Sequence, residues 1–194
     1  MNSLGRKSVD GLELDALHRA VLKPGEPMHD EHGNAHYLPR FFLEVPSWPA
    51  ARELRVAAHF KLAELMMVDC REAQVQLQSF PHYVPCAIVV LARYLEAFRL
   101  EAGIPVFISA NGGYRSPAHQ LSASASRHHW ATAADIYRVG DTYLDDEKAI
   151  DRYARIATSL GPEVFVRPYA QGDDHLHVDI GFVTLAPREC SESV

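Results

Sequence analysis

Two histidine-rich segments of the chain carry the residue types that hold a catalytic metal ion. The first is Ser126–Asp135, which reads SRHHWATAAD, and the second is His175–Asp179, which reads HLHVD and follows about forty residues later. Two imidazoles and one carboxylate are the ligand set of a zinc ion that keeps one coordination position open for catalysis. The chemistry indicated by these segments is therefore metal-assisted hydrolysis.

The second segment predicts a strand that places its polar residues together. Residues 175–180 alternate polar and apolar side chains, a pattern typical of a half-buried strand. His175, His177 and Asp179 then share one face, and the apolar residues between them face the core. Two histidines on one face are suited to act at one site.

The first segment supplies the remaining groups. Residues 133–137 predict another short strand, and an antiparallel place beside the histidine strand would bring Asp135 close to His177. His128 would reach in from the loop before that strand. The sequence thus predicts that one carboxylate and two imidazoles converge.

Four motifs, in the same order along the chain, resemble those of the D-alanyl-D-alanine carboxypeptidase-like zinc peptidases, a group that includes lysostaphin-type and hedgehog-like domains. They are FKLAEL from Phe60, GYRSP from Gly113, the Ser-x-His-x-x-Gly-x-Ala-x-Asp signature over 126–135, and His-x-His over 175–177. The resemblance covers roughly residues 59 to 183. Ala131 departs from it, because the family usually has glycine there, and a position that favours positive φ would be strained by the methyl group by about 1 kcal/mol.

The resemblance implies a fold and a set of roles. It implies a hedgehog or D,D-peptidase type of α+β fold and Zn²⁺ as the cofactor, with His128, Asp135 and His177 as the metal ligands. His175 would lie beside the catalytic water, as base or as a stabiliser of the tetrahedral intermediate. Arg115 would contact the substrate.

Three neighbouring residues have both a functional and a structural interpretation. The planar guanidinium of Arg115 suits a carboxylate or a developing oxyanion, although it could be a surface group beside a turn. Ser126 could bind a substrate carboxylate or cap a turn. Asp174 lies three residues before His177, where some relatives place a catalytic glutamate, but its shorter side chain ranks it behind His175 as a base.

Other histidines are less informative. His129 adjoins His128 and must point elsewhere if its neighbour binds metal, so a supporting or surface role is expected. His29, His32 and His36 form a cluster that could bind a metal, but the glycine, asparagine and charged residues around it indicate a solvated loop.

The expected substrate class is a peptide that contains D-amino acids, such as a peptidoglycan stem peptide or a D-Ala-D-Ala dipeptide. The enzyme would be a carboxypeptidase, a dipeptidase or an endopeptidase. One alternative is a zinc-bearing binding module without catalysis, as the hedgehog-like relatives and Ala131 suggest. Another is a non-haem iron oxygenase, since two histidines and a carboxylate also form the iron facial triad, although His128 and Asp135 are farther apart than its usual pair.

Composition excludes several classes of partner. The net charge is −6, and no run of lysine and arginine is present, so nucleic acid is not an expected partner. No apolar run approaches the about 18 residues of a membrane span, and the first residues lack the apolar core of a secretory signal. The protein is expected to be cytoplasmic as synthesised, with release to the cell wall by a separate route as the alternative. The sequence leaves the oligomeric state open.

The 194 residues suggest one main domain with an addition. Residues 1–55, rich in proline, are expected to form an N-terminal extension packed on a zinc D,D-peptidase-like domain of residues 56–194. The expected class is α+β, with a small, mostly antiparallel sheet backed by helices. Helices are predicted near 12–22, 62–66, 85–102 and 145–160, and strands near 41–45, 106–110, 133–138, 164–166 and 175–183.

Overall fold

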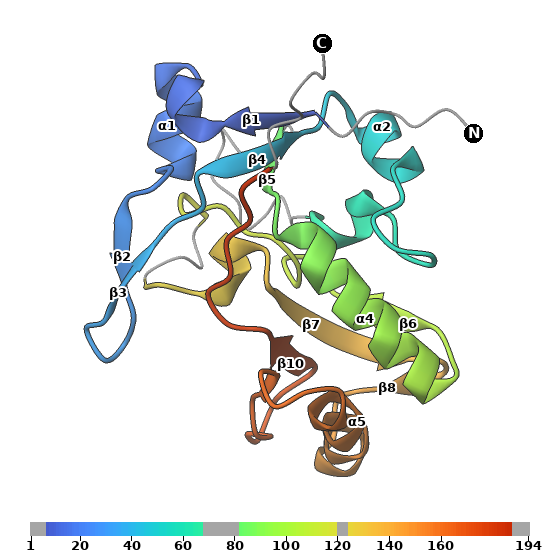
Figure 1. Cartoon of the computed structure of the whole chain (residues 1–194). Coiled ribbons are helices and arrows are strands. Elements are labelled where there is room, and N and C mark those ends of the chain that lie inside the picture. The colour runs from blue at the N-terminus through green and yellow to red at the C-terminus, as the bar shows by residue number, and fades with distance from the viewer. Residues whose placement is uncertain (1–6, 68–81, 120–123, 188–194) are drawn as a thin grey trace.

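Antiparallel sheets and helices make up the computed structural model, which describes residues 7–67, 82–119 and 124–187 (Figure 1). The α-helices are α1 (Ala16–Leu22), α2 (Trp48–Glu53), α4 (Ile88–Ala102) and α5 (Glu147–Ser159). Short 3-10 helices are η1 (Gly11–Glu13), η2 (Leu62–Leu65) and η3 (Arg127–Trp130). The strands are β1 (Ser8–Asp10), β2 (Pro27–His29), β3 (Ala35–Tyr37), β4 (Phe41–Glu44), β5 (Tyr83–Pro85), β6 (Val106–Ile108), β7 (Ala133–Val139), β8 (Thr142–Tyr143), β9 (Phe165–Val166) and β10 (Leu176–Asp179). The expected α+β class is confirmed.

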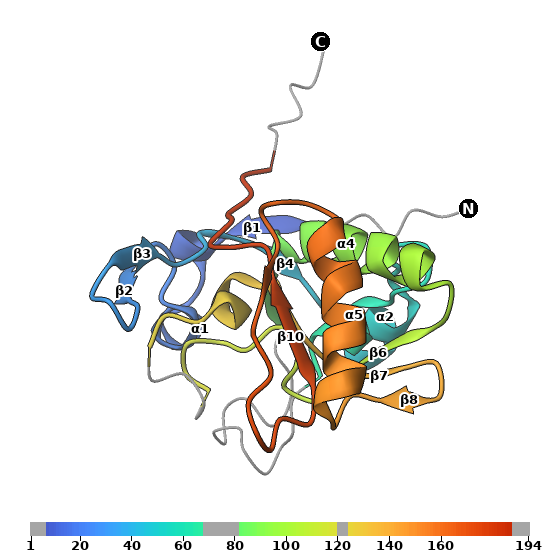
Figure 2. The ribbon, with the colours of Figure 1, turned by 90° about the horizontal axis from the view of Figure 1, so that it is seen from below.

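The largest sheet has the order β6-β7-β10-β9, with β8 paired to β7, and every pairing in it is antiparallel. Ala134 and Ile136 of β7 and Leu176 and Val178 of β10 are fully buried in the main core. Helix α5 packs on β9 and β10 and also contacts α4. In Figure 2 the two helices lie on one side of β10, whereas the β2–β3 hairpin projects on the other. Because side chains alternate along a strand, the residues between these apolar ones point away from the helices.

The two long helices begin and end at recognisable signals. Asp146 caps α5 by accepting a hydrogen bond from the backbone N–H of Ala149. Gly103, at φ 70°, ends α4 in the left-handed conformation that glycine adopts without strain. The helix predicted from residue 85 begins at Ile88, because Tyr83–Pro85 is strand β5 and pairs with β4.

The first 55 residues share a sheet and a core with later ones. Strand β4 lies between β1 and β5 in a three-stranded sheet, so a strand of the first segment pairs with one from residues 83–85. Leu22 and Phe42 belong to the same buried cluster as Leu91 of α4. The domain boundary at residue 55 stays a prediction. The helix expected near 12–22 is present as α1 and ends at Leu22, but it begins only after its cap Asp15, because residues 11–13 form the separate η1.

The segment around His29, His32 and His36 was interpreted as a solvated loop: His32 does lie in an exposed turn, but His29 and His36 belong to strands β2 and β3. Strands β2 and β3 pair as a hairpin. Its turn is closed by Asp30, whose Oδ1 accepts hydrogen bonds from the backbone N–H groups of His32 and Asn34. Helix α2 was also missed, because the prolines around it indicate breaks, yet Pro49 lies in its first turn, where proline is tolerated. None of the described helices is long and apolar enough to cross a membrane.

Candidate metal centre

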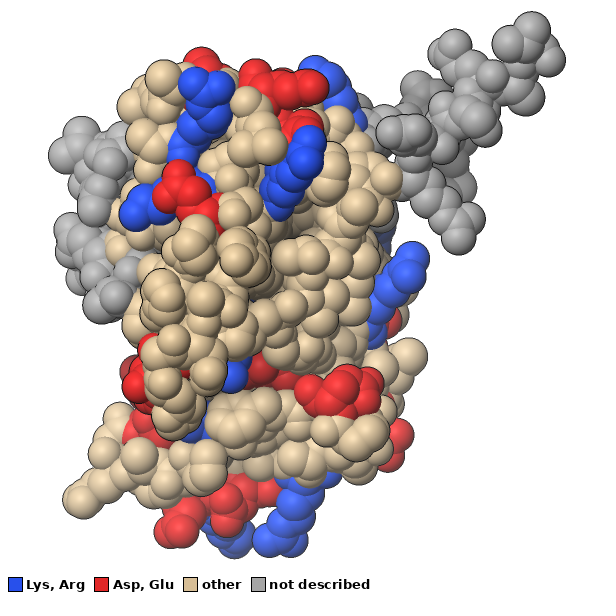
Figure 3. All heavy atoms as spheres, turned by 60° about the vertical axis from the view of Figure 1, so that its left-hand side comes forward, with Lys and Arg blue, Asp and Glu red and all other residues tan. Residues whose placement is uncertain are grey.

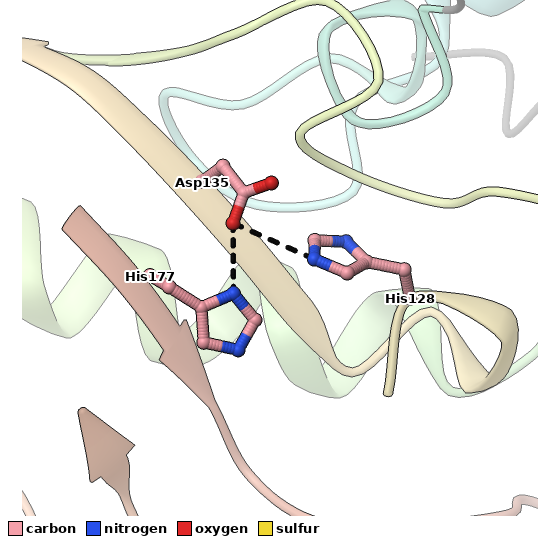
Figure 4. A group of neighbouring side chains, drawn as sticks. All are labelled: His128, Asp135 and His177. Atoms are coloured by element: carbon pink, nitrogen blue, oxygen red, sulfur yellow. Dashed lines mark hydrogen bonds and ion pairs between the residues drawn. The ribbon is translucent and has the colours of Figure 1, made fainter. Parts of the chain in front are cut away.

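Asp135 and His177 are paired residues of neighbouring strands, and His128 approaches them from η3 (Figure 4). The Asp135 Oδ1 atom lies 2.8 Å from His177 Nδ1 and 3.5 Å from His128 Nε2. One ligand atom from each of the three residues lies within 4.8 Å of the others. The antiparallel register places Asp135 beside His177, as the alternation in the sequence predicted.

His128 is held in one orientation by the backbone. Its Nδ1 lies 2.8 Å from the carbonyl oxygen of Gly113, which only accepts hydrogen bonds, so Nδ1 carries the proton. The lone pair is then on Nε2, the nitrogen that faces Asp135. Burial lowers the pKa of His128, which favours the neutral ring that a metal ligand must have.

His177 is held between two carboxylates. Its Nδ1 faces Asp135 and its Nε2 lies 3.3 Å from Oδ2 of Asp179, a residue that is 1% exposed. Burial acts to lower the pKa of His177, but the hydrogen bonds and charges of the two carboxylates overcome it and raise the pKa. Each ring nitrogen of His177 thus faces a carboxylate oxygen, and Nδ1 is the nitrogen on the side of Asp135 and His128.

The carboxylate of Asp135 stays ionised despite its burial. Burial acts to raise its pKa, but the interactions with His128 and His177 hold it well below the ordinary value. Arg115 Nη1 lies 3.9 Å from Asp135 Oδ2 and adds a further positive group. One buried carboxylate and two imidazole nitrogens together form a ligand set that suits a divalent cation such as Zn²⁺.

Asp179 was placed on the face of the histidines but given no role from the sequence. Its carboxylate accepts hydrogen bonds from the backbone N–H of Gly181 and from His177 Nε2. A carboxylate behind a metal-binding histidine fixes the ring and raises its basicity. The spacing of two residues from His177 was a signal that could have identified it.

Asp179→Asn is expected to weaken Zn²⁺ binding about tenfold, because the amide keeps the shape but not the charge behind His177. Competition with a chelating dye gives the affinity, and circular dichroism verifies the fold. Asp151→Asn is the matched control, since it removes the same charge from the exposed face of α5. Equal affinity in both variants would show that Asp179 does not support the site.

His175 also approaches the shared carboxylate. Its Nε2 lies 3.6 Å from Asp135 Oδ1, and its Nδ1 donates to Asp174 Oδ1 at 2.7 Å. Arg167 Nη2 lies 3.2 Å from the same Nε2 and is a neighbour that the sequence gave no reason to single out. The Asp174 side chain is 84% exposed, and its contact with the site is the hydrogen bond that it accepts from His175.

Ser126 is the N-cap residue of η3, and His129 lies within η3. Ser126 begins η3 and lines a pocket together with His177. His129 is buried, with its ring nitrogens 3.0 Å from the carbonyl oxygen of Arg115 and 3.3 Å from that of Ser124. Burial lowers the pKa of His129 to about 4, so the ring is neutral at neutral pH. His129 thus points away from the metal-binding group, as expected.

The structure tests two further expectations from the sequence, the backbone conformation at Ala131 and the possible metal site of the histidines in residues 29–36. Ala131 ends η3 at φ 57° and ψ 39°, the left-handed region that the sequence had indicated for this position. Within the described ranges, His128, Asp135 and His177 form the one group of three or more potential ligands. His29, His32 and His36 are not brought together, and His36 instead binds Asp30 through Nε2 at 2.9 Å.

Comparison with known proteins gives one match. The model of a family described as Peptidase M15 matches residues 58–179, a range that includes His128, Asp135 and His177. No curated protein and no solved structure matches the chain.

Proposed function

Because this chain belongs to the peptidase M15 family, we propose that it is a zinc-dependent hydrolase that cleaves peptide bonds in peptides containing D-amino acids. The observation that carries the proposal is the convergence of His128, Asp135 and His177 on one point at the surface of the sheet. The same convergence alone would also suit iron, but the family is one of peptidases, which favours hydrolysis over oxygenation.

The residues present fit zinc. His128 would offer Nε2, His177 Nδ1 and Asp135 a carboxylate oxygen, and each histidine has its other nitrogen bound by a fixed acceptor. A bound zinc ion supplies Lewis-acid chemistry, namely the polarisation of a carbonyl and the activation of water for attack. Three protein ligands leave room for these reactants.

The surrounding residues of the chain would supply proton transfer and substrate binding. His175 has its proton on Nδ1, directed to Asp174, so its lone pair is on Nε2, where it accepts from Arg167 Nη2 at 3.2 Å. As a base, Nε2 would accept a proton from water in place of that arginine contact. His175 can later return that proton to the leaving amine, while Asp174 holds the ring in place. Arg115 would bind the substrate carboxylate or the developing oxyanion, and Ser126 would assist from the pocket wall.

The experiment that tests this function combines metal analysis with digestion. Purified protein is loaded with one equivalent of Zn²⁺ and incubated with D-Ala-D-Ala and, separately, with peptidoglycan fragments, and the products are identified by mass spectrometry. Cleavage of the dipeptide supports a dipeptidase, whereas cleavage of the fragments supports an enzyme that acts on peptidoglycan stem peptides. Absence of cleavage of either substrate by fully loaded protein would overturn the proposal in favour of a binding module.

Arg115→Lys tests the binding of a substrate carboxylate. The lysine keeps the positive charge but loses the bidentate geometry, so we expect kcat/KM for a free-acid peptide to fall about tenfold. The same peptide with a C-terminal amide should be a poor substrate of the original protein, and its kcat/KM should hardly change with the substitution. Equal cleavage of acid and amide by the original protein would indicate an endopeptidase and remove Arg115 from carboxylate recognition.

A further inference from the structure

The β2–β3 hairpin is attached to both segments that carry the candidate metal ligands. Trp130 of η3 donates from Nε1 to the carbonyl oxygen of Tyr37 at 3.0 Å. His36 stacks on Phe182, just after β10, with ring centroids 3.6 Å apart and an interplanar angle of 18°. The backbone N–H of Ala125 donates to the carbonyl oxygen of His29. The hairpin is thus fixed beside His128 and His177.

A pocket of about 260 Å³ lies between the hairpin turn and the metal centre. The residues that line it are Asp30, Glu31, His32, Ser124, Ala125, Ser126, Arg127 and His177. Because His177 is in its wall, a peptide placed for attack at His177 and Asp135 has this pocket directly beside it. The pocket is smaller than the about 300–1,000 Å³ of sites that enclose a whole ligand, so it suits one part of a longer substrate.

The hairpin is the part of the pocket that the family match does not cover. Its residues precede residue 58, where the match begins, whereas the opposite wall lies inside it. This wall therefore comes from residues outside the range that the family model matches. Figure 3, in which the left-hand side of Figure 1 comes forward, shows acidic side chains and recessed basic atoms along a band across this face.

The charges on the two walls differ. Asp30 and Glu31 give the hairpin wall two carboxylates, and the Glu31 side chain is 83% exposed, with His32 Nε2 at 3.6 Å. On the opposite wall, the charge of Arg127 is directed to Asp179, 3.8 Å away, and its guanidinium lies over the ring of Phe182. Arg115, a positive group next to Asp135, is not among the residues that line the pocket.

We propose that this pocket is a substrate subsite in which the hairpin turn, through the exposed carboxylate of Glu31, takes an ammonium group of the peptide. The inference rests on the proposed function. A substrate with a carboxylate at Arg115 and an ammonium at the hairpin matches the charges at both ends. The ammonium can be the N-terminal group or the side chain of a diamino acid, since both have the same chemistry.

The test uses two pairs of peptides that differ by one acetyl group. D-Ala-D-Ala and its N-acetyl form test the N-terminal ammonium. Nα-acetyl-L-Lys-D-Ala-D-Ala and its Nα,Nε-diacetyl form test the side-chain ammonium. We expect the zinc-loaded protein to prefer the ammonium member of one pair about threefold to fivefold in kcat/KM, the size of an exposed ion pair, and to lose this preference at high salt.

Glu31→Gln should reduce that preference below twofold, and Glu31→Lys should reverse it. Glu53→Gln is the matched control, because it removes one exposed carboxylate from α2, outside the pocket, and should leave the preference unchanged. Equal kcat/KM within both pairs, or a preference that persists in both Glu31 variants, would overturn the subsite and leave the proposed function standing.

A binding measurement separates the two proposals. The same four peptides are titrated into metal-free protein, and the backbone amide chemical shifts of residues 30–32 and 124–127 are followed by NMR. Stronger shifts with the ammonium member of a pair, lost in Glu31→Gln, support the subsite even if no peptide is hydrolysed. Identical shifts with acetylated and free peptides would contradict it, whatever the activity.

Discussion

Alanine at position 128, 135 or 177 is expected to abolish stoichiometric zinc binding and to reduce peptide hydrolysis on the order of a thousandfold, or about 4 kcal/mol of transition-state stabilisation. The physical reason is that His128, Asp135 and His177 are the three residues grouped as ligands, so the loss of any one leaves too few donors. Metal content is measured after dialysis, and turnover is measured with a D,D-peptide. Full metal content in all three variants would refute the assignment.

His175→Ala is the contrasting variant. Its ring approaches Asp135 at 3.6 Å but lies outside the group of three, so zinc should remain bound. Turnover should nevertheless fall about 100-fold, the usual contribution of a general base. If this variant loses its zinc, His175 is a ligand and the coordination proposed here is wrong.

Gly113→Ala is expected to destabilise the protein by about 3 kcal/mol or more, because the added methyl group meets backbone that cannot move aside. A Cβ at Gly113 would lie 2.1 Å from the carbonyl oxygen of Leu65. That close approach is fixed by the hydrogen bond from the N–H of Tyr114 to the same oxygen, at 2.7 Å. The carbonyl of Gly113 also holds His128, so zinc affinity should fall with stability.

Gly161→Ala provides the matched control for that substitution. A Cβ there would lie 2.5 Å from the carboxylate of Glu163, which is the far end of a flexible side chain and can turn away. Urea unfolding of the metal-free proteins should show a loss of less than about 1 kcal/mol for this variant. Similar losses in the two variants would show that the contact with Leu65 is not the cause.

The centre of the site could be predicted because its geometry follows from strand periodicity. The strand predicted over 175–183 is β10, which is shorter (Leu176–Asp179) and leaves His175 just before it, but His177 and Asp179 still share one face. The register of His177 to Asp135 follows from pairing this strand with β7. The long helices were predictable for a similar reason, since α5 has a capping aspartate and an apolar stripe. Local patterns were sufficient where each element carries its own signal.

The parts of the fold and of the site that could not be predicted from the sequence depend on contacts between distant parts of the chain. Strands β1 and β5 have three residues each, too few to show a period, and they exist because β4 pairs with both. Asp30 closes the hairpin turn through hydrogen bonds between its side chain and the backbone. The composition of this stretch shows only that it is polar and charged, so it did not identify these bonds. Arg167 reaches His175 from the strand edge by tertiary placement alone.

The pairing of β4 with β5 also limits how this protein can have been assembled from parts. Among the described residues, β5 lies within the family-matched range of 58–179, but the strand that satisfies its backbone lies before that range. A gene segment cut at residue 58 and moved to another protein would expose the edge of β5 and remove Phe42 from the core. The segment that can fold with all its strands paired is therefore longer than the range that the family model matches, and it includes the residues of the hairpin.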